Sequence, residues 1–194
     1  MKLHTITLTS LIAATAIIST SSLHADDSST AIPYSAVPKD FGWQFDSYGL
    51  RAGVDAEDDL QLHTYELFAT VNTPYSWKIG DKSRLQLNLE GAVGGLVEDD
   101  DSGYYVRFGP QLVLNLGDSP FSLVAASGPA YLSEDVFNNM DLGGKLQFFS
   151  SLGVDWKLSD CCTIGYRWHH ISNAGIHDKN PGLNMHTLGI TWKF

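Results

Sequence analysis

The feature that most constrains this chain is a repeated alternation of apolar and polar residues, in segments separated by stretches rich in Gly, Asp, Asn, Ser and Pro. Successive side chains of a β-strand point to opposite faces, so each segment predicts a strand with one apolar and one polar face. The clearest segment runs from Tyr104 to Leu116, and others cover 84–93 and 146–156. Eight such segments follow Asp46, which predicts an all-β fold, an eight-stranded antiparallel β-barrel.

The polar faces decide which side of this barrel is inside. A soluble barrel keeps its apolar face inward, whereas an outer-membrane barrel turns it toward lipid and fills its interior with polar groups. Buried charges need partners, and an eight-stranded interior is narrow enough for them to pair across it. The charged residues that share the polar faces are Arg84, Glu90, Arg107, Lys145, Asp155 and Arg167. We therefore predict a transmembrane barrel of the bacterial outer membrane.

Both ends of the chain fit this prediction. Residues 1–25 are typical of a secretory signal peptide, with Lys2, an apolar stretch over 6–18 and Ala25 before the expected cleavage point. The apolar stretch is too short to anchor the chain as a membrane helix. Residues 26–45 are expected to form an interfacial lead-in and residues 46–194 the barrel. The last strand ends at Phe194, which resembles the C-terminal signature of bacterial outer-membrane proteins.

Composition excludes several functions. The formal net charge of −10 leaves no basic surface for nucleic acid. No metal-ligand spacing, phosphate loop or dinucleotide fingerprint is present, so we expect no metal and no cofactor. The only cysteines are the neighbours Cys161 and Cys162. Two turn residues without chemistry are favoured over a redox pair, which would normally be spaced as Cys-x-x-Cys.

Placing both termini of the barrel on the periplasmic side sets the expected orientation. We expect periplasmic turns at 74–82, 117–119 and 158–161, and external loops at the other end. Acidic residues gather in those external loops, where they either keep the loops solvated or contact lipopolysaccharide phosphates through divalent cations. They are Asp55, Glu57, Asp58, Asp59, Glu98, Asp99, Asp100, Asp101, Glu134, Asp135, Asp141 and Asp178.

The sequence Trp-His-His-Ile-Ser-Asn-Ala-Gly over 168–175 carries the candidate chemistry. His170 and Ser172 share one face of the predicted strand, where an imidazole can take a proton from a hydroxyl. The same face carries Ile164, Tyr166 and Trp168, so the pair is predicted to face lipid.

Residues 166–194 contain this motif and Asn-Pro-Gly-Leu-Asn over 180–184, and they resemble the lipid A 3-O-deacylase (PagL) family. The resemblance implies an eight-stranded outer-membrane serine esterase whose substrate is lipid A of lipopolysaccharide. It implies that Ser172 is the nucleophile, His170 the general base, and the backbone amides of Asn173 and Gly175 the oxyanion hole. A homodimer is left open.

The third member of the family's triad is a glutamate twelve residues after the serine, and Asn184 occupies that position. An amide oxygen orients the imidazole without supplying the charge of a carboxylate. Papain-type proteases and outer-membrane phospholipase A use Asn in this role. His186 lies on the same face and is either an additional partner for the catalytic residues or a residue at the membrane interface. His169 should point inward. Asp178 can replace the missing acid only if its loop folds back toward His170.

Three functions are compatible with these residues. The first is removal of an ester-linked acyl chain from lipid A. The second is a phospholipase-type esterase, which the combination of Ser, His and Asn also allows. The third is a non-catalytic structural or adhesive barrel in which Asn184 marks a degenerate site.

Overall fold

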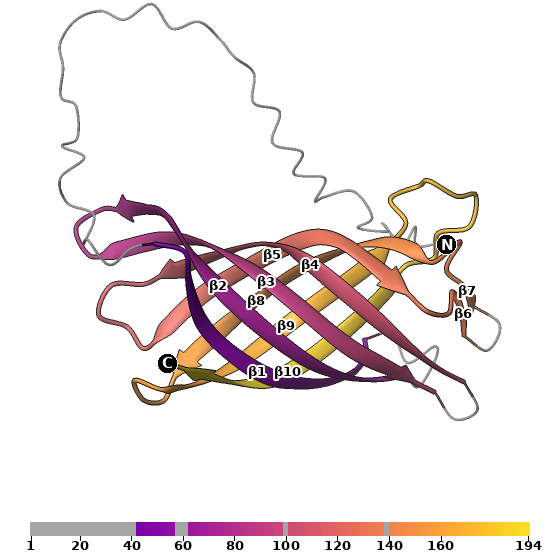
Figure 1. The fold of residues 1–194 in the computed structure, drawn as a ribbon, viewed down its shortest axis with the longest axis horizontal. Helices are drawn as coiled ribbons and strands as arrows, with labels where there is room; N and C mark the ends of the chain where they lie inside the picture. Colours follow the sequence, from indigo (N-terminus) through magenta and orange to yellow (C-terminus); the bar gives the residue numbers. More distant parts are fainter. Residues whose placement is uncertain (1–41, 57–61, 99–100, 138–139) are drawn as a thin grey trace, which may run out of the picture. The chain divides into compact units, whose positions relative to one another are not determined.

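The computed structural model describes residues 42–56, 62–98, 101–137 and 140–194. Eight antiparallel strands form a closed barrel in the order β1-β10-β9-β8-β5-β4-β3-β2, which confirms the predicted fold (Figure 1). The strands are β1 (Gln44–Asp55), β2 (His63–Ile79), β3 (Ser83–Val97), β4 (Ser102–Asn115), β5 (Phe121–Leu132), β8 (Leu146–Lys157), β9 (Cys162–Ser172) and β10 (Leu183–Lys193). The short strands β6 (Val136–Phe137) and β7 (Met140–Asp141) form a separate two-stranded sheet in the connection between β5 and β8. Among the described residues, no helix is long and apolar enough to cross a membrane.

The barrel has a turn end and a loop end. Turns at 80–82, 116–120 and 158–161 connect strands at the turn end. The opposite end, where β1 leads to β2, β3 to β4, β5 to β8 and β9 to β10, is the loop end. The first turn is shorter than the predicted 74–82, because β2 resumes pairing with β3 at Ser76 after a register shift that begins at Asn72. Pro74 lies inside that shift, where its missing N–H removes no regular ladder bond.

At three points the structure differs from the sequence-based expectation. Strand β1 begins at Gln44, inside the expected lead-in, while 1–41 lie outside the described residues. Asp55, expected in an external loop, ends β1 and is buried, and Asp141 belongs to β7. Other acidic positions of the expected loops, at 57–59 and 99–100, lie outside the described residues.

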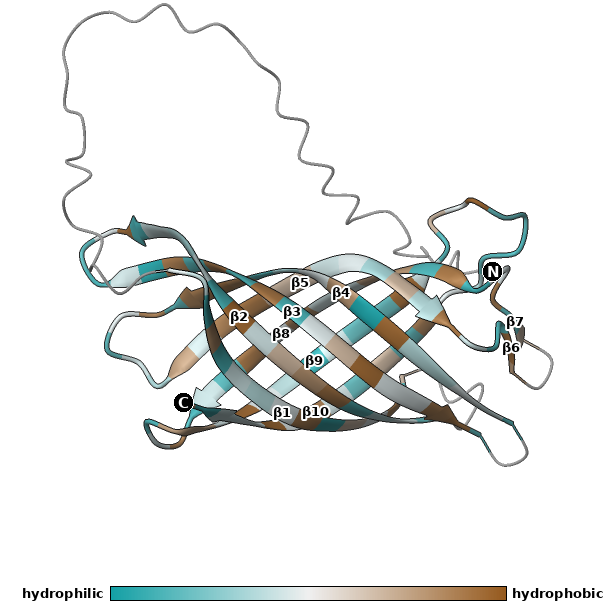
Figure 2. Cartoon of the chain, in the orientation of Figure 1, coloured by the Kyte–Doolittle hydropathy of each residue, from teal (hydrophilic) through white to brown (hydrophobic). Residues whose placement is uncertain are grey.

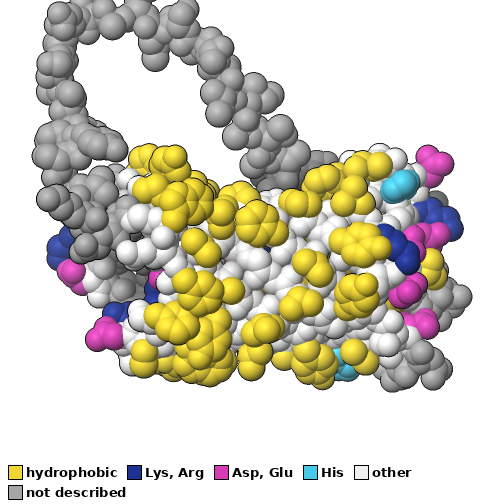
Figure 3. Space-filling model, viewed as in Figure 1, with side chains coloured by type: hydrophobic (Ala, Val, Ile, Leu, Met, Phe, Trp, Pro, Cys, Tyr) yellow, Lys and Arg dark blue, Asp and Glu magenta, His cyan; other side chains and the backbone are white. Residues whose placement is uncertain are grey.

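The outward face of the barrel is apolar, as predicted. Exposed apolar side chains such as Leu50, Leu67 and Val93 form a belt around the middle, and charged side chains gather toward the two ends (Figures 2 and 3). An outward-facing apolar band around the middle of a barrel is the feature that contacts lipid in outer-membrane barrels. The barrel is therefore of the transmembrane type.

The lumen contains a buried ion cluster. The Arg51 guanidinium lies 2.5 Å from a Glu66 oxygen and 2.7 Å from a Glu90 oxygen, and Arg107 contacts the same two carboxylates at 2.7 and 2.8 Å. Nearer the turn end, Arg167 and Asp155 pair at 2.7 Å. The interior charges are thus paired, as expected, but between adjacent strands or strands one apart rather than across the full lumen.

Lys145 was wrongly predicted to join the interior charges. It precedes β8, is exposed, and approaches Glu134 at 3.9 Å. The alternation placed Lys145 on the inward parity, but parity applies only where the strand is formed.

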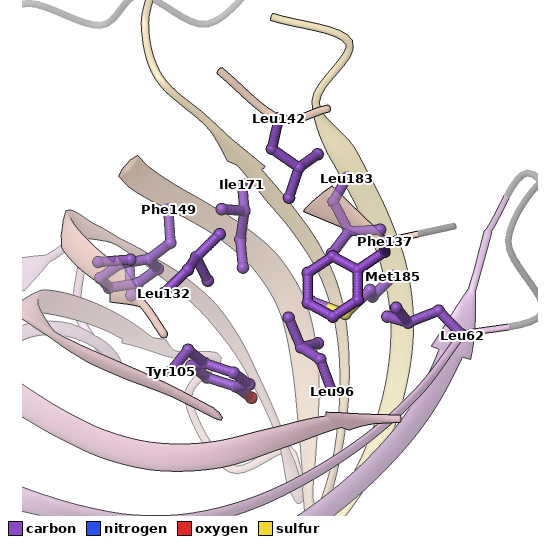
Figure 4. Close-up of a cluster of buried hydrophobic side chains, with 12 residues drawn as sticks. Leu62, Leu96, Tyr105, Leu132, Phe137, Leu142, Phe149, Ile171, Leu183 and Met185 are labelled. Carbon is purple, nitrogen blue, oxygen red and sulfur yellow. The ribbon is translucent and has the colours of Figure 1, made fainter. Parts of the chain in front are cut away.

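An apolar cluster fills the lumen at the loop end, which the sequence did not predict (Figure 4). Phe137 and Leu142, from the connection that carries β6 and β7, pack with residues of the barrel strands. The strand and loop residues of this cluster include Leu62, Leu96, Tyr105, Leu132, Phe149, Ile171, Leu183 and Met185. The polar interior is therefore closed at the end where the candidate site lies.

Candidate active site

The structure brings three predicted site residues to the outward wall at the loop end. His170 and Ser172 lie on β9, and Asn184 pairs directly with His170 from β10. All three side chains are half-buried, between buried residues that point into the lumen, such as Ile171. Their parity agrees with Tyr166 further along β9, which is exposed.

His170 is held on three sides. Its Nδ1 lies 2.8 Å from Asn184 Oδ1, and because an amide oxygen only accepts, Nδ1–H is the donor. The ring stacks on Trp168 with centroids 6.0 Å apart and planes inclined by 14°. On the third side lies Gly182, where an added Cβ would come within 2.9 Å of His170 Cε1. The tautomer set by Asn184 leaves the lone pair of Nε2 available to accept a proton.

Ser172 lies two residues beyond His170 on the same face of β9. In the described part of the chain no hydrogen bond joins the Ser172 hydroxyl to His170. Side chains at this spacing are neighbours along one face of a strand. The pairing of nucleophile and base therefore stays a prediction that requires rotation of the Ser172 side chain.

The segment after Ser172 is fixed by Asn173, whose side chain is fully buried. Asn173 Nδ2 donates to the carbonyl oxygens of Lys179 at 2.6 Å and Leu142 at 3.0 Å. The next two residues, Ala174 and Gly175, both have positive φ values, 55° and 79°. The buried amide thus ties the loop that follows β9 to the loop that precedes β8.

The two amides expected to form the oxyanion hole donate within this loop. The N–H of Asn173 donates to Asn180 Oδ1 at 3.0 Å, and the N–H of Gly175 donates to Asn173 Oδ1 at 2.9 Å. In the described conformation both N–H groups therefore already have acceptors within the protein. The assignment stays a prediction, and it requires these hydrogen bonds to open when substrate binds.

A surface ion pair closes the same loop contact. Lys179 Nζ lies 2.8 Å from Asp141 Oδ2, and the N–H of Gly143 donates to Asp141 Oδ1 at 2.8 Å. The hydrogen bond from Lys179 holds the pKa of the Asp141 carboxyl below its usual value, and the same contact raises the pKa of Lys179. The charged forms of both side chains therefore favour the observed loop arrangement.

The remaining residues weighed in the sequence occupy separate places. His169 points into the lumen and is buried, as expected. His186 is exposed on the outward wall, where its Nδ1 lies 2.7 Å from the Tyr166 hydroxyl. Among the described residues Asp178 has no hydrogen bond or ion pair with His170, and Cys161 and Cys162 are free.

Sequence reasoning missed two outward serines, Ser127 and Ser150. Ser127 on β5 pairs with Ser150 on β8, which pairs with His170 on β9. Their signal was present, because Ser150 has the same parity as the outward Phe148 and Leu152. A serine among apolar residues of one face does not change the alternation that predicts the strand, so the pattern alone does not single it out.

A shallow apolar groove on the outward wall is lined by residues other than those of the site. It spans β9, β10, β1, β2 and β3, and Leu188 at its edge is the next outward residue after His186. Its apolar lining includes Leu50, Ala52, Tyr65, Leu67, Val93, Ile164, Leu188 and Ile190.

A closed barrel with an apolar belt and a His, Asn and Ser cluster on its outer wall defines a membrane β-barrel with a lipid-facing polar site. The chain belongs to the lipid A 3-O-deacylase (PagL) family, whose model matches residues 63–193. This confirms the resemblance read from the motif.

Individual relatives agree with this assignment. The chain is 35% identical over 74 residues to lipid A deacylase PagL of Bordetella bronchiseptica and 32% identical over 94 residues to that of Pseudomonas aeruginosa. These matches cover 38% and 46% of the chain and 42% and 54% of the relatives, about half their length. The crystal structure of the outer membrane enzyme PagL has the same fold, with a TM-score of 0.66 and 21% identity over 75% of this chain and 97% of that one.

Proposed function

We propose that this protein is an outer-membrane serine esterase that removes an ester-linked acyl chain from lipid A, as a 3-O-deacylase. The observation that carries this proposal is the hydrogen bond between His170 and Asn184 beside Ser172, on the outward wall at the loop end. A nucleophile placed there meets substrates that lie in the membrane. Membership of the lipid A 3-O-deacylase family supports lipid A as that substrate.

In the proposed reaction, His170 Nε2 takes the proton of Ser172, and the hydroxyl oxygen attacks the ester carbonyl carbon. The imidazolium then protonates the departing sugar oxygen, which leaves the acyl chain on Ser172. A water molecule, deprotonated by His170, releases the fatty acid and restores the serine. Donors among the amides of 173–175 stabilise the oxyanion in both steps once their internal hydrogen bonds open.

Asn184 replaces the family's acid in holding His170. Its Oδ1 accepts from Nδ1–H and so fixes the tautomer in which Nε2 is a base. A carboxylate would also stabilise the imidazolium formed during attack, and an amide contributes only its dipole. We therefore expect activity below that of an enzyme with Glu at this position.

The proposed orientation places the loop end outside the cell. The site then faces the leaflet that contains lipopolysaccharide, and the turn end with β1 and β10 termini faces the periplasm. Asp101, Glu134, Asp135 and Asp178 lie at the loop end, where divalent cations could link carboxylates to lipid phosphates.

The decisive experiment compares lipid A from bacteria that express the wild-type chain, Ser172→Ala or Asn184→Glu, by mass spectrometry. Wild type should remove one acyl chain, Ser172→Ala none, and Asn184→Glu at least as much as wild type. Ser151→Ala is the matched control, because Ser151 is a serine of the neighbouring strand that points into the lumen. Identical lipid A in all four strains would refute lipid A deacylation, and identical glycerophospholipids as well would favour the non-catalytic barrel.

A phospholipase-type esterase is the second candidate, since the His170–Asn184 hydrogen bond also suits that chemistry. The same extracts separate the two activities. Loss of an acyl chain from glycerophospholipids, with lipid A unchanged, would replace the lipid A assignment.

A further inference from the structure

A row of polar side chains crosses the outward wall of the barrel. Ser127, Ser150, His170 and Asn184 are direct cross-strand partners on β5, β8, β9 and β10. By contrast, the outward positions at the middle of β1 to β4 are apolar, for example Leu50, Leu67 and Phe108. Polar groups facing hydrocarbon are costly, so their concentration on one part of the wall needs a functional reason.

The hydroxyl protons of this row are ordered. Ser127 Oγ donates its only proton to the carbonyl oxygen of Phe149 at 2.9 Å. In the 3.3 Å contact between Ser127 Oγ and Ser150 Oγ, the donor must then be Ser150. Ser150 is left with lone pairs and no proton to give. Its oxygen is therefore an acceptor that faces the membrane beside His170.

This acceptor lies on the membrane side of the candidate site. His170 and Asn184 lie close to the loop end of their strands, Ser150 lies further along β8, and Ser127 is near the middle of β5. Directly paired residues have Cβ atoms about 4.5–5.5 Å apart, and diagonal neighbours such as Ser172 and Ser150 are about 7–8 Å apart. When the ester carbonyl carbon lies at the Ser172 hydroxyl, a hydroxyl on the second carbon beyond it in the acyl chain would reach the Ser150 oxygen.

We propose that Ser150, oriented by Ser127, is a substrate-positioning residue that accepts a hydrogen bond from a hydroxyl on the acyl chain to be cleaved. This inference rests on the proposed esterase function and deepens it. It predicts that the site distinguishes a hydroxylated acyl chain from an unsubstituted one. Since ordinary glycerophospholipid chains have no such hydroxyl, it also predicts a preference against them.

The test uses the purified full chain in detergent micelles with two synthetic glucosamine lipids. They differ only in that one ester carries a 3-hydroxyacyl chain and the other an unsubstituted chain of equal length. Wild type should show the higher kcat/KM on the hydroxylated lipid, and Ser150→Ala should lower that value about tenfold while leaving the other unchanged. Ser150→Thr, which keeps the hydroxyl, should retain the preference, and the lumen-facing Ser151→Ala should leave both values unchanged.

Binding is measured separately on Ser172→Ala, from quenching of tryptophan fluorescence by brominated versions of the two lipids. The double variant Ser172→Ala, Ser150→Ala should lose the difference in Kd between them. Equal Kd values with Ser150 present, or equal losses for both lipids on its removal, would overturn this inference. An absence of hydrolysis with the binding difference intact would overturn the esterase function and leave the role of Ser150 standing.

Discussion

At the residue scale, the candidate site depends on how closely the backbone approaches His170. Gly182 has a φ of 75°, and the space where its side chain would lie is occupied by the imidazole. Glycine is therefore required there both for its conformation and for its missing Cβ. The residue belongs to the Asn-Pro-Gly-Leu-Asn segment of the motif, but no sequence pattern indicates which ring it contacts.

Gly182→Ala should displace the imidazole from Asn184. We expect kcat for lipid A deacylation to fall by about a hundredfold, because misplacement of a catalytic group by about 1 Å has effects of that size. The positive φ should in addition cost about 1–2 kcal/mol of folding stability. Activity assays on purified protein and urea unfolding would measure the two effects.

Gly80→Ala separates the effect of backbone strain at a positive φ from the effect of displacing the His170 imidazole. Gly80 has a φ of 62° in the turn between β2 and β3, and an added Cβ there meets no atom within 4 Å. This variant should lose similar stability and keep full activity. Equal kcat in the two variants would show that Gly182 does not position His170.

At the element scale, strand parity carries most of what the sequence could predict. Period-two alternation correctly placed His170, Ser172 and Asn184 on the outward wall, because a strand allows only two directions for a side chain. Loop contacts could not be predicted, since they join residues far apart in the chain without periodicity. The hydrogen bonds from the Asn173 side chain to the loop of 142–143 are of this kind. The backbone N–H groups expected to bind the oxyanion are occupied separately, by the side chains of Asn180 and Asn173.

The Asp141–Lys179 pair should make the contact between these two loops pH-dependent. The folded pKa of Asp141 is lowered, so the stabilisation of the loop contact by its carboxylate is present above the unfolded pKa of about 3.9. This stabilisation is lost as the pH falls through the folded pKa. The folded pKa of Lys179 is raised, so the stabilisation of the loop contact by its ammonium group is present below the unfolded pKa of about 10.4. This stabilisation is lost as the pH rises through the folded pKa. The contact should be complete between about pH 4 and pH 10.

Lys179→Met should therefore lower the hydrogen-exchange protection of amides in 173–182 at pH 7, by about twofold for an exposed pair. Mass spectrometry at several pH values, corrected for intrinsic exchange rates, would measure it. Lys157→Met is the matched control, because it removes an exposed pair with Asp160 at the turn end. Unchanged protection in Lys179→Met would mean that Asn173 alone holds the loops together.

At the scale of the whole molecule, the sequence predicted a closed barrel with paired interior charges but not how the interior is divided. Charges at fixed parity had to find partners inside a narrow lumen, and they found them on adjacent strands or strands one apart. The apolar cluster at the loop end depends on the connection 133–145, which brings Phe137 and Leu142 over the barrel. Nothing in the local sequence of that connection indicates the direction in which it folds.

The ion cluster joins four neighbouring strands, since Arg51, Glu66, Glu90 and Arg107 lie on β1, β2, β3 and β4. Each guanidinium contacts both carboxylates, so the cluster is electrically balanced. Glu90→Gln keeps the shape of the side chain and leaves two arginines facing one carboxylate. Because an unpaired buried charge is costly, we expect a loss of about 3–5 kcal/mol in the free energy of unfolding.

Urea unfolding from phospholipid vesicles, followed by tryptophan fluorescence, would measure this loss. Asp118→Asn is the control, because its partner Lys82 and Asp118 itself are exposed, and such pairs contribute at most about 1 kcal/mol. Adding Arg51→Met to Glu90→Gln restores the balance of charge in the cluster. The double variant should therefore lose less stability than the two single variants together, and strict additivity would contradict electrostatic coupling across the four strands.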